Sequence, residues 1–371
     1  MIYVSCFLVS VFFAYLAQKS RDKKVMILFS VISILVPSIL GGLRANGVGI
    51  DTLVYGYQNC MRALRSPDFL TFNKASGTDL GYNIICYSVM KTFGHENWFY
   101  FVCMLITISC TYVGAYRHKD KIPLYVTMFV FYFMFYNRSL NVIRQFLSAS
   151  IIFMNFDKLE KKEYGKFSLW ILFASLFHRS AFMVFGVGLA MHMVMTSDEV
   201  QKKAWLKFAI LISVAVMLAF TRRIMRTALS FVPFLAAKYD VYFDNQYNET
   251  GGSTLILLIT FGTLLMMLLY RKGATYTLSG PAEAKSNIEF YKFNLIFCII
   301  FQLAVRFMLN RFLLYSQVFN IFATAAISRF VKEKYLRVIT NMILIAVMIF
   351  YWWWHYVVKK DSGTWPYVSI L

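Results

Sequence analysis

The amino-acid sequence predicts an all-α, polytopic integral membrane protein that forms a single membrane-embedded domain, residues 1–371. Of its residues, 59% are hydrophobic and 15% are charged, whereas a soluble domain has about 45–50% apolar and about 25% charged residues. Apolar runs recur along the whole chain, and about 20 apolar residues cross a bilayer as a helix. The first run begins at Ile2 with no basic segment before it, so no cleavable signal peptide is expected.

Ten apolar stretches predict membrane-spanning helices. They are 2–18, 25–41, 97–116, 122–137, 139–156, 204–220, 253–270, 288–305, 307–328 and 338–357. One further stretch, 166–195, is too long for one span and short for two. We interpret it as a tight pair of helices, 166–177 and 181–195, that turns at "FHRSA". The sequence therefore predicts about 12 crossings, with boundary errors of a few residues.

The connections between the spans predict the orientation, because cytoplasmic loops carry an excess of Lys and Arg. The basic segments are "KSRDKK" (19–24), "RHKDK" (117–121), "DKLEKKEYGK" (157–166), "QKK" (201–203), "RKGATYTLSGPAEAK" (271–285) and "RFVKEKYLR" (329–337). Both termini then lie outside, with two long loops, about 42–96 and 221–252, that we expect to contribute to a site. The stretch "DLGYNIICYSVMKTF" (79–93) would place "RHKDK" outside if it crossed, so it is predicted as a re-entrant or interfacial helix on the outer side.

This orientation leaves basic residues on the outer side, where they are disfavoured. They are Arg44, Arg138, Arg144, Arg179, Arg222, Arg223, Arg226, Lys238, Arg306 and Arg311. Those of "TRRIMR" (221–226) are also explained by snorkelling to lipid headgroups. Arg144, Arg179 and Arg306 lie inside apolar sequence, where a charge costs about 2.5 kcal/mol or more on insertion scales. Because few outer carboxylates can neutralise them, they predict a phosphate or diphosphate ligand, which guanidinium groups bind bidentately.

Other motifs exclude several classes of function. The net charge is +20, but much of the excess lies in the predicted cytoplasmic loops, so no nucleic-acid partner is predicted. No Walker A loop, DxD triplet or Cys/His ligand cluster is present, so no cofactor and no metal are predicted.

Four stretches, in order along the chain, carry a resemblance to a known family. "GGLRANGVGIDTLVY" (41–55), "LNVIRQFLSASIIF" (140–153), "FASLFHRSAFMVF" (173–185), and "RFMLNRFLLY" (306–315) with the terminal "WPY" (365–367) resemble the motifs of EpsG-type, Wzy-like polysaccharide polymerases. The family is similar to GT-C glycosyltransferases. It often has Glu at the position of Asp79 in "GTDLGYN" (77–83), a departure that leaves the role of this residue open.

The resemblance implies a metal-independent glycosyltransferase of the bacterial inner membrane whose active site faces the periplasm or cell exterior. It would transfer a glycan from undecaprenyl diphosphate to the non-reducing-end hydroxyl of another lipid-linked repeat unit, with a chain-length regulator as a candidate partner. Three alternatives remain. An O-antigen ligase would use the same donor, and a flippase of lipid-linked glycans would also need cationic residues in the membrane. A non-enzymatic scaffold for a chain-length regulator would not need buried arginines.

The expected catalytic residues are His178 and Asp51. His178 would accept the proton of the acceptor hydroxyl or bond the leaving group, and otherwise it caps the turn. The expected diphosphate ligands are Arg44, Arg144, Arg179, Arg306 and Arg311; the Arg44–Asp51 pair could instead tie down its Gly-rich loop. The expected glycan contacts are Gln145, Lys238, Tyr239 and Asp240.

Overall fold

The computed structural model describes residues 1–197, 253–270, 281–303 and 312–370, with scattered positions between 202 and 227. In these residues every regular element is helical, and the one strand-like pairing is an antiparallel bridge between Arg44 and Ser369. The prediction of an all-helical membrane protein is confirmed. Four described helices are long and apolar enough to cross a membrane: Ile2–Lys19, Lys23–Gly42, Glu96–Arg117 and Lys334–Val358. The count of about 12 spans and the GT-C likeness stay predictions.

Two compact units make up the chain, Met1–Phe182 with Val331–Leu371, and Met183–Phe330. That the two units act as one membrane-embedded domain stays a prediction. We call them the first and the second unit.

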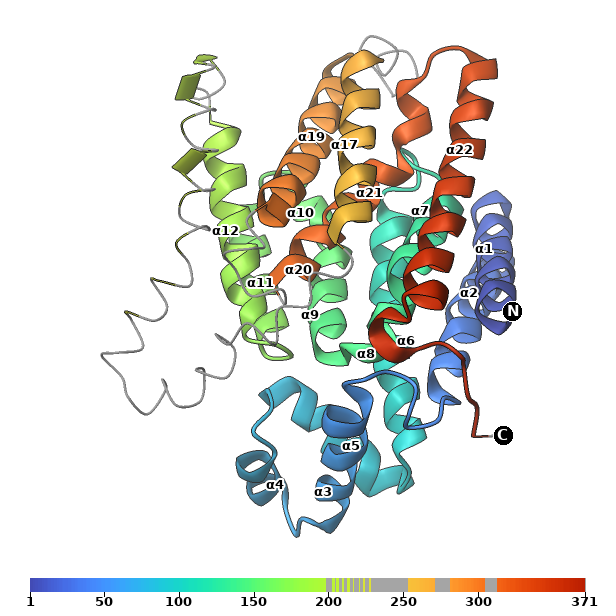
Figure 1. Cartoon of the computed structure of the whole chain (residues 1–371), viewed down its shortest axis with the longest axis vertical. Coiled ribbons are helices and arrows are strands. Elements are labelled where there is room, and N and C mark those ends of the chain that lie inside the picture. Colours follow the sequence, from blue (N-terminus) through green and yellow to red (C-terminus); the bar gives the residue numbers. More distant parts are fainter. Residues whose placement is uncertain are drawn as a thin grey trace. The chain divides into compact units, whose positions relative to one another are not determined.

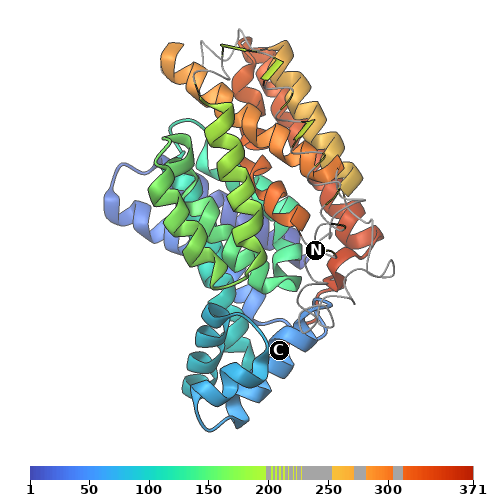
Figure 2. The same ribbon diagram turned by 90° about the vertical axis from the view of Figure 1, so that its left-hand side faces the viewer.

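The first unit is built around a row of long helices. Helix α1 (Ile2–Lys19) packs against α2 (Lys23–Gly42), and α2 packs against α6 (Glu96–Arg117) (Figures 1 and 2). Helix α2 begins at Asp22, whose carboxylate accepts hydrogen bonds from the backbone N–H of Lys24 and Val25, as an N-cap aspartate normally does.

A helical hairpin follows α6. The chain forms α7 (Leu124–Phe131), the π-helix η2 (Tyr132–Tyr136), α8 (Asn137–Asn141) and α9 (Ile143–Met154). Val142, with φ −93° and ψ 61°, separates α8 from α9. The predicted spans 122–137 and 139–156 are therefore two helices, but the turn between them comes at residue 142. The turn places Arg144 in the first helical turn of α9.

Two of the predicted cytoplasmic segments lie together at one end of this unit. Lys121 Nζ is 2.6 Å from Glu160 Oε1, and Arg117 Nη1 is 3.5 Å from Asp157 Oδ1. Asp157 and Glu160 lie on the short helix α10 (Phe156–Glu160). "RHKDK" and "DKLEKKEYGK" thus share one side, as the predicted orientation requires.

Short helices occupy the segment 42–96, which the sequence predicted as a loop except for 79–93. They are η1 (Thr52–Gln58), α3 (Asn59–Arg65), α4 (Phe69–Ser76) and α5 (Leu80–Phe93). Helices α3, α4 and α5 pack on one another beyond the end of the unit at which α8 meets α9 (Figure 1). The helix expected over 79–93 is present as α5, and its outer-side position stays a prediction.

The tight pair predicted around "FHRSA" is present as α11 (Tyr164–Ser175) and α12 (Ser180–Met195). After the second unit the chain re-enters the first as α22 (Lys334–Trp352), continued by η8 (Trp353–Val358) and η9 (Asp361–Gly363). The C-terminal tail then lies along the loop after α2, where Ala45 N donates to Val368 O at 2.9 Å.

The second unit contains α17 (Ser253–Leu269), α19 (Pro281–Leu303), α20 (Leu313–Val318), α21 (Asn320–Ala325) and η7 (Ile327–Phe330). Its core includes packed aromatic side chains, with the ring centroids of Phe297 and Phe319 4.8 Å apart and the two rings tilted relative to each other. Asn320 Nδ2 donates to Thr260 Oγ1 at 2.8 Å and joins α21 to α17, a type of bond that membrane helices use between apolar faces.

We predict that α4 and the α6–α7 connection lie on opposite sides of the membrane. In separate variants, Lys74→Cys should react with a membrane-impermeant maleimide added outside, and Asp120→Cys should react only after the membrane is opened. The background should be low, because five of the six native cysteines are buried and Cys110 is half-buried. Outside labelling of Asp120→Cys would overturn the topology.

Candidate functional site

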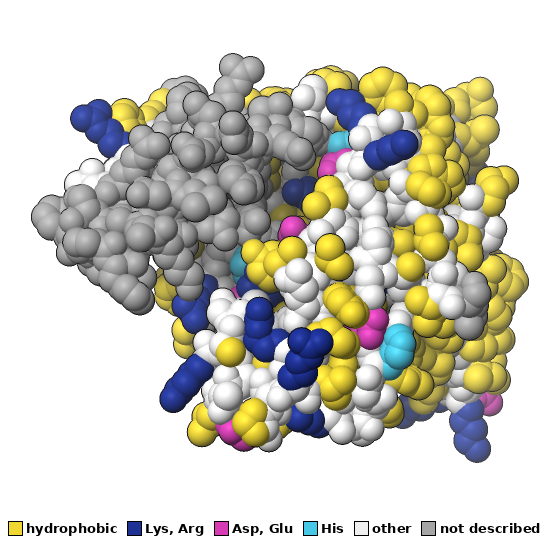
Figure 3. Space-filling model, turned by 60° about the horizontal axis from the view of Figure 1, so that its bottom comes forward, with side chains coloured by type: hydrophobic (Ala, Val, Ile, Leu, Met, Phe, Trp, Pro, Cys, Tyr) yellow, Lys and Arg dark blue, Asp and Glu magenta, His cyan; other side chains and the backbone are white. Residues whose placement is uncertain are grey.

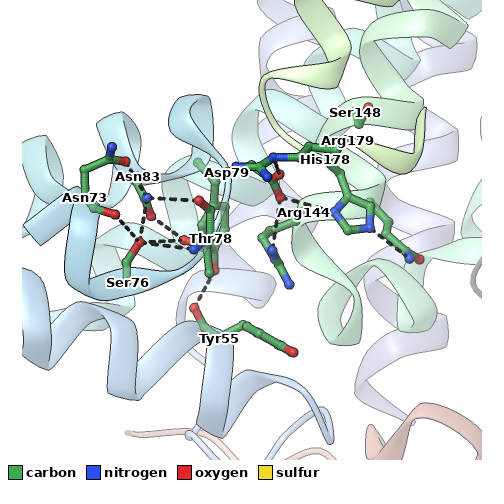
Figure 4. A network of polar contacts seen from close by, with 12 residues as sticks. Tyr55, Asn73, Ser76, Thr78, Asp79, Asn83, Arg144, Ser148, His178 and Arg179 are labelled. Carbon is green, nitrogen blue, oxygen red and sulfur yellow. Dashed lines mark hydrogen bonds and ion pairs between the residues drawn. The ribbon is translucent and has the colours of Figure 1, made fainter. Parts of the chain in front are cut away.

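Three chain segments of the first unit bring their polar side chains together around Asp79 (Figure 4). Asp79 precedes α5, Arg144 lies in the first turn of α9, and His178 and Arg179 form the turn between α11 and α12. Asp79 Oδ2 is 3.1 Å from Arg144 Nη1 and 3.3 Å from His178 Nδ1. Asp79 Oδ1 is 3.3 Å from Arg179 Nε. We call these four residues the Asp79 cluster.

Asp79 occupies the N-cap position of α5, yet its side chain makes no hydrogen bond to that helix. The comparable aspartates behave differently: Asp22 caps α2, and Asp68 caps α4 through the backbone N–H of Thr71. An N-cap bond is worth about 1 kcal/mol to a helix. The carboxylate of Asp79 therefore contacts the other residues of the cluster and does not form the N-cap hydrogen bond that would stabilise α5.

The cluster has an excess of positive charge. Burial alone would raise the pKa of Asp79, but the hydrogen bond from His178 and the positive charges of Arg144 and Arg179 outweigh it and hold this pKa below its usual value. Asp79 is thus ionised at neutral pH, and one carboxylate faces two guanidinium groups. The remaining positive charge favours an anionic ligand.

Arg144 is held in an aromatic slot. Its guanidinium carbon is 4.3 Å from the ring centroid of Tyr55 in η1 and 5.9 Å from that of Tyr82 in α5. Tyr82 Oη donates to the backbone carbonyl oxygen of Tyr55 at 2.7 Å, which joins the Tyr82 side chain to η1. The side chain of Arg144 is 14% exposed, whereas that of Arg179 is 77% exposed.

His178 is held from both ring nitrogens. Nδ1 faces Asp79, and Nε2 lies 3.3 Å from Gln145 Nε2. Because a carboxylate and an amide N–H surround it, the imidazole fits as the neutral tautomer with the proton on Nδ1. The structure thus brings together the sequence-predicted residues Arg144, Gln145, His178 and Arg179.

A polar network holds the backbone before Asp79. Asn83 Nδ2 donates to Asn73 Oδ1 at 2.8 Å and to Ser76 Oγ at 2.6 Å, and Thr78 Oγ1 donates to Asn83 Oδ1. Asn83 is fully buried. The chain between α4 and α5 is therefore fixed, and Asp79 with it (Figure 4).

Gly81 brings α5 into contact with the end of α11. Its backbone N–H donates to Leu176 O at 2.8 Å, so α11 supplies the acceptor that the first turn of α5 needs. A Cβ at this position would lie 3.1 Å from the same carbonyl oxygen and 3.2 Å from Phe177 Cε1. A side chain here would force Leu176 or Phe177 to shift by a few tenths of an ångström, so glycine permits the close approach that places Asp79 beside His178.

The structure does not show Arg44 in the Asp79 cluster. Arg44 is fully buried, its guanidinium stacks 4.5 Å from the Tyr100 ring centroid, and Nη1 donates to Gly41 O. Its backbone pairs with Ser369 of the C-terminal tail. These contacts favour the alternative in which Arg44 stabilises its loop. Its diphosphate role stays a prediction.

Asp51 lies where the same loop meets α8. Its backbone N–H donates to Asn141 Oδ1 at 2.6 Å, and Thr52 Oγ1 donates to Leu140 O. Gly49, with φ +101°, passes so close that a Cβ would lie 3.2 Å from Asn141 Cα. The loop is thereby held against the turn that carries Arg144. The role of Asp51 as a base stays a prediction.

Five predicted site residues lie outside the described residues. They are Arg306, Arg311, Lys238, Tyr239 and Asp240. The predicted outer loop 221–252 lies outside them as well, except for Arg223 and Thr227.

Asp79, Tyr55 and Tyr82 belong to the cluster or contact it, although the sequence did not predict this. Tyr55 ends the first motif, and this position could have indicated it. Asp79 is the first residue of the helix predicted over 79–93, and its departure from the family's usual Glu left its role open.

Exposed basic side chains surround this end of the unit. Arg62 and Arg65 of α3, Lys74 of α4 and Lys91 of α5 are exposed, and Figure 3 shows basic side chains gathered here. Such residues attract anionic lipid headgroups. Among the described residues, no group of three or more His, Cys, Asp and Glu side chains could hold a metal ion.

Together these features define an all-helical membrane protein with a partly buried cationic cluster at one end of a helical unit. A model of the EpsG family matches residues 27–369, and the chain therefore belongs to the EpsG family. Membership indicates a polymerase-like function in polysaccharide synthesis at a membrane. No curated protein and no solved structure matches the chain.

We predict that Gly81→Ala destabilises the protein by about 1–3 kcal/mol, because the added methyl group forces α5 away from α11. Gly165→Ala is the matched control. Gly165 also stands second in its helix, α11, and nothing lies within 4 Å of a Cβ there. Thermal unfolding of both purified variants measures the difference. Equal midpoints would contradict the proposed close approach.

Proposed function

We propose that the protein is a bacterial inner-membrane polysaccharide polymerase. It transfers a glycan from undecaprenyl diphosphate to the non-reducing-end hydroxyl of another lipid-linked repeat unit at the outer face of the membrane. The observation that carries this proposal is the Asp79 cluster, in which one carboxylate faces Arg144 and Arg179. A partly buried site with this charge suits a diphosphate.

The arginines act on the leaving group. As the bond between the anomeric carbon and the diphosphate oxygen breaks, negative charge grows on the diphosphate. Guanidinium groups already in place stabilise this charge without reorganisation. Arg144 is oriented by Tyr55, Tyr82 and Asp79, so its two parallel N–H groups present a fixed fork to phosphate oxygens.

His178 acts on the acceptor. Its Nε2 accepts the proton of the sugar hydroxyl while the oxygen forms the new bond to the anomeric carbon. The electron pair of the broken bond leaves with the undecaprenyl diphosphate. Gln145, 3.3 Å from this nitrogen, occupies the direction from which the hydroxyl would approach.

The rivals differ in the product they predict. A ligase would use the same donor but transfer the glycan to a different acceptor lipid, and a flippase would move the lipid without lengthening it. The direct test incubates the purified protein with lipid-linked repeat units extracted from the strain that carries this chain. A ladder of longer products supports the polymerase. Unchanged substrate under conditions in which a reference polymerase is active contradicts it.

We predict that Arg144→Lys lowers polymer formed per folded protein by about 10- to 150-fold. Lysine keeps the charge but loses the bidentate geometry, and a charged hydrogen bond is worth about 1.5–3 kcal/mol. Arg65→Lys, on an exposed position of α3, is the control and should remain near wild type. Normal specific activity of Arg144→Lys would remove Arg144 from the site.

We predict that polymerisation needs no divalent metal, because the arginines neutralise the charge of the diphosphate. Activity in excess EDTA should equal activity without it. Loss of activity that Mg²⁺ or Mn²⁺ restores would contradict this mechanism.

A further inference from the structure

In the steps above Asp79 serves only to orient Arg144, although it also contacts His178 and Arg179. Its two carboxylate oxygens have different partners. Oδ1 contacts the exposed Arg179, and Oδ2 contacts both Arg144 and His178. An aspartate needed only to neutralise the arginines would not have to face the imidazole. This arrangement indicates that Asp79 also acts on the orientation of His178.

We infer that Asp79 is a positioning residue that orients His178 for proton transfer. Its Oδ2 accepts the Nδ1–H of the imidazole, which fixes the ring and leaves Nε2 as the proton acceptor. A carboxylate in this place also stabilises the imidazolium that forms when Nε2 takes up the proton, as in other histidine bases held by a carboxylate. This inference rests on the proposed function of His178.

The surroundings hold Asp79 in this orientation. Asn83 fixes the preceding residue, Thr78, and the bond from Gly81 to Leu176 joins the start of α5 to the turn that carries His178. The carboxylate is released from capping its own helix. Two independent contacts therefore define the distance between Asp79 and His178, as a positioning function requires.

The contacts of Asp79 predict opposite effects of its substitution on turnover and on donor binding. Asp79 neutralises part of the charge of Arg144 and Arg179, so it competes with the phosphate oxygens of the donor for these groups. Asp79→Asn removes this competition and also removes the charge that orients His178. The variant should therefore bind the donor as well as the wild type or better, yet turn it over slowly.

The first experiment compares Asp79→Asn with the wild type. We expect kcat for polymerisation to fall about 100-fold or more, while the Kd for undecaprenyl diphosphate stays within about threefold of wild type or decreases. Asp79→Glu, which keeps the charge, should recover part of the lost kcat. Asp68→Asn exchanges the same groups at the exposed cap of α4 and should leave both quantities unchanged. A kcat of Asp79→Asn within threefold of wild type, or a Kd that rises in proportion to the loss of kcat, would overturn the inference.

The second experiment reads the imidazole directly and does not depend on activity. The chain has five histidines, so ¹⁵N-histidine labelling with His178→Gln as the assignment reference isolates the signals of His178. In the wild type Nδ1 should carry the proton, and in Asp79→Asn this preference should be lost. A proton on Nε2 in the wild type would overturn the inference. A wild-type chain that shows the Nδ1–H tautomer but forms no ladder would support the inference about Asp79 and contradict the proposed polymerase.

Discussion

The ion pair between Arg144 and Asp79 is the interaction on which the arrangement of the site depends. A charge removed from water is costly, and loss of one partner of a buried pair typically costs about 3–5 kcal/mol. The ion pair therefore holds together two elements that are far apart in the sequence, α9 and the start of α5. Tyr55 and Tyr82 add stacking contacts to the same guanidinium. Because the pair is incompletely shielded from solvent, it can exchange partners with an anion that enters.

The family motifs form two groups in the structure. One group, Arg144 with Gln145 and His178 with Arg179, supplies groups that can meet a ligand. The other group builds the frame behind them: Arg44 and Gly49 shape a loop, the C-terminal tail pairs with it, and Thr52 with Asp51 fastens it to the end of α8. All of these contacts position the loop that carries Tyr55.

The helices could largely be predicted from the sequence, and so could the turn at "FHRSA", because both follow from apolar runs and their interruptions. Helices α3 and α4 could not, since they are short and mixed in polarity and depend on packing against α5. A break between the two helices that contain 122–137 and 139–156 was predicted, but its position at Val142 was not, because no Gly or Pro marks it. The burial of Arg44 depends on a tail more than 300 residues away, about which local sequence says nothing. Asp79 was not assigned to the site because the family often has Glu at its position, and nothing in the local sequence places it beside Arg144 and His178.

The two arginines of the cluster differ in exposure, and in the proposed function this difference gives them different parts in binding the diphosphate. Arg179 is 77% exposed, so its ion pair with Asp79 contributes little to stability, and its side chain is free to move toward a phosphate near the membrane surface. Arg144 is 14% exposed and fixed by two tyrosines, so its geometry costs little entropy when the ligand binds. A diphosphate, with two adjacent charged groups, can engage a mobile and a fixed guanidinium at once. A monophosphate has only one such group, and this gives the site a physical reason to prefer the diphosphate-linked form of a lipid.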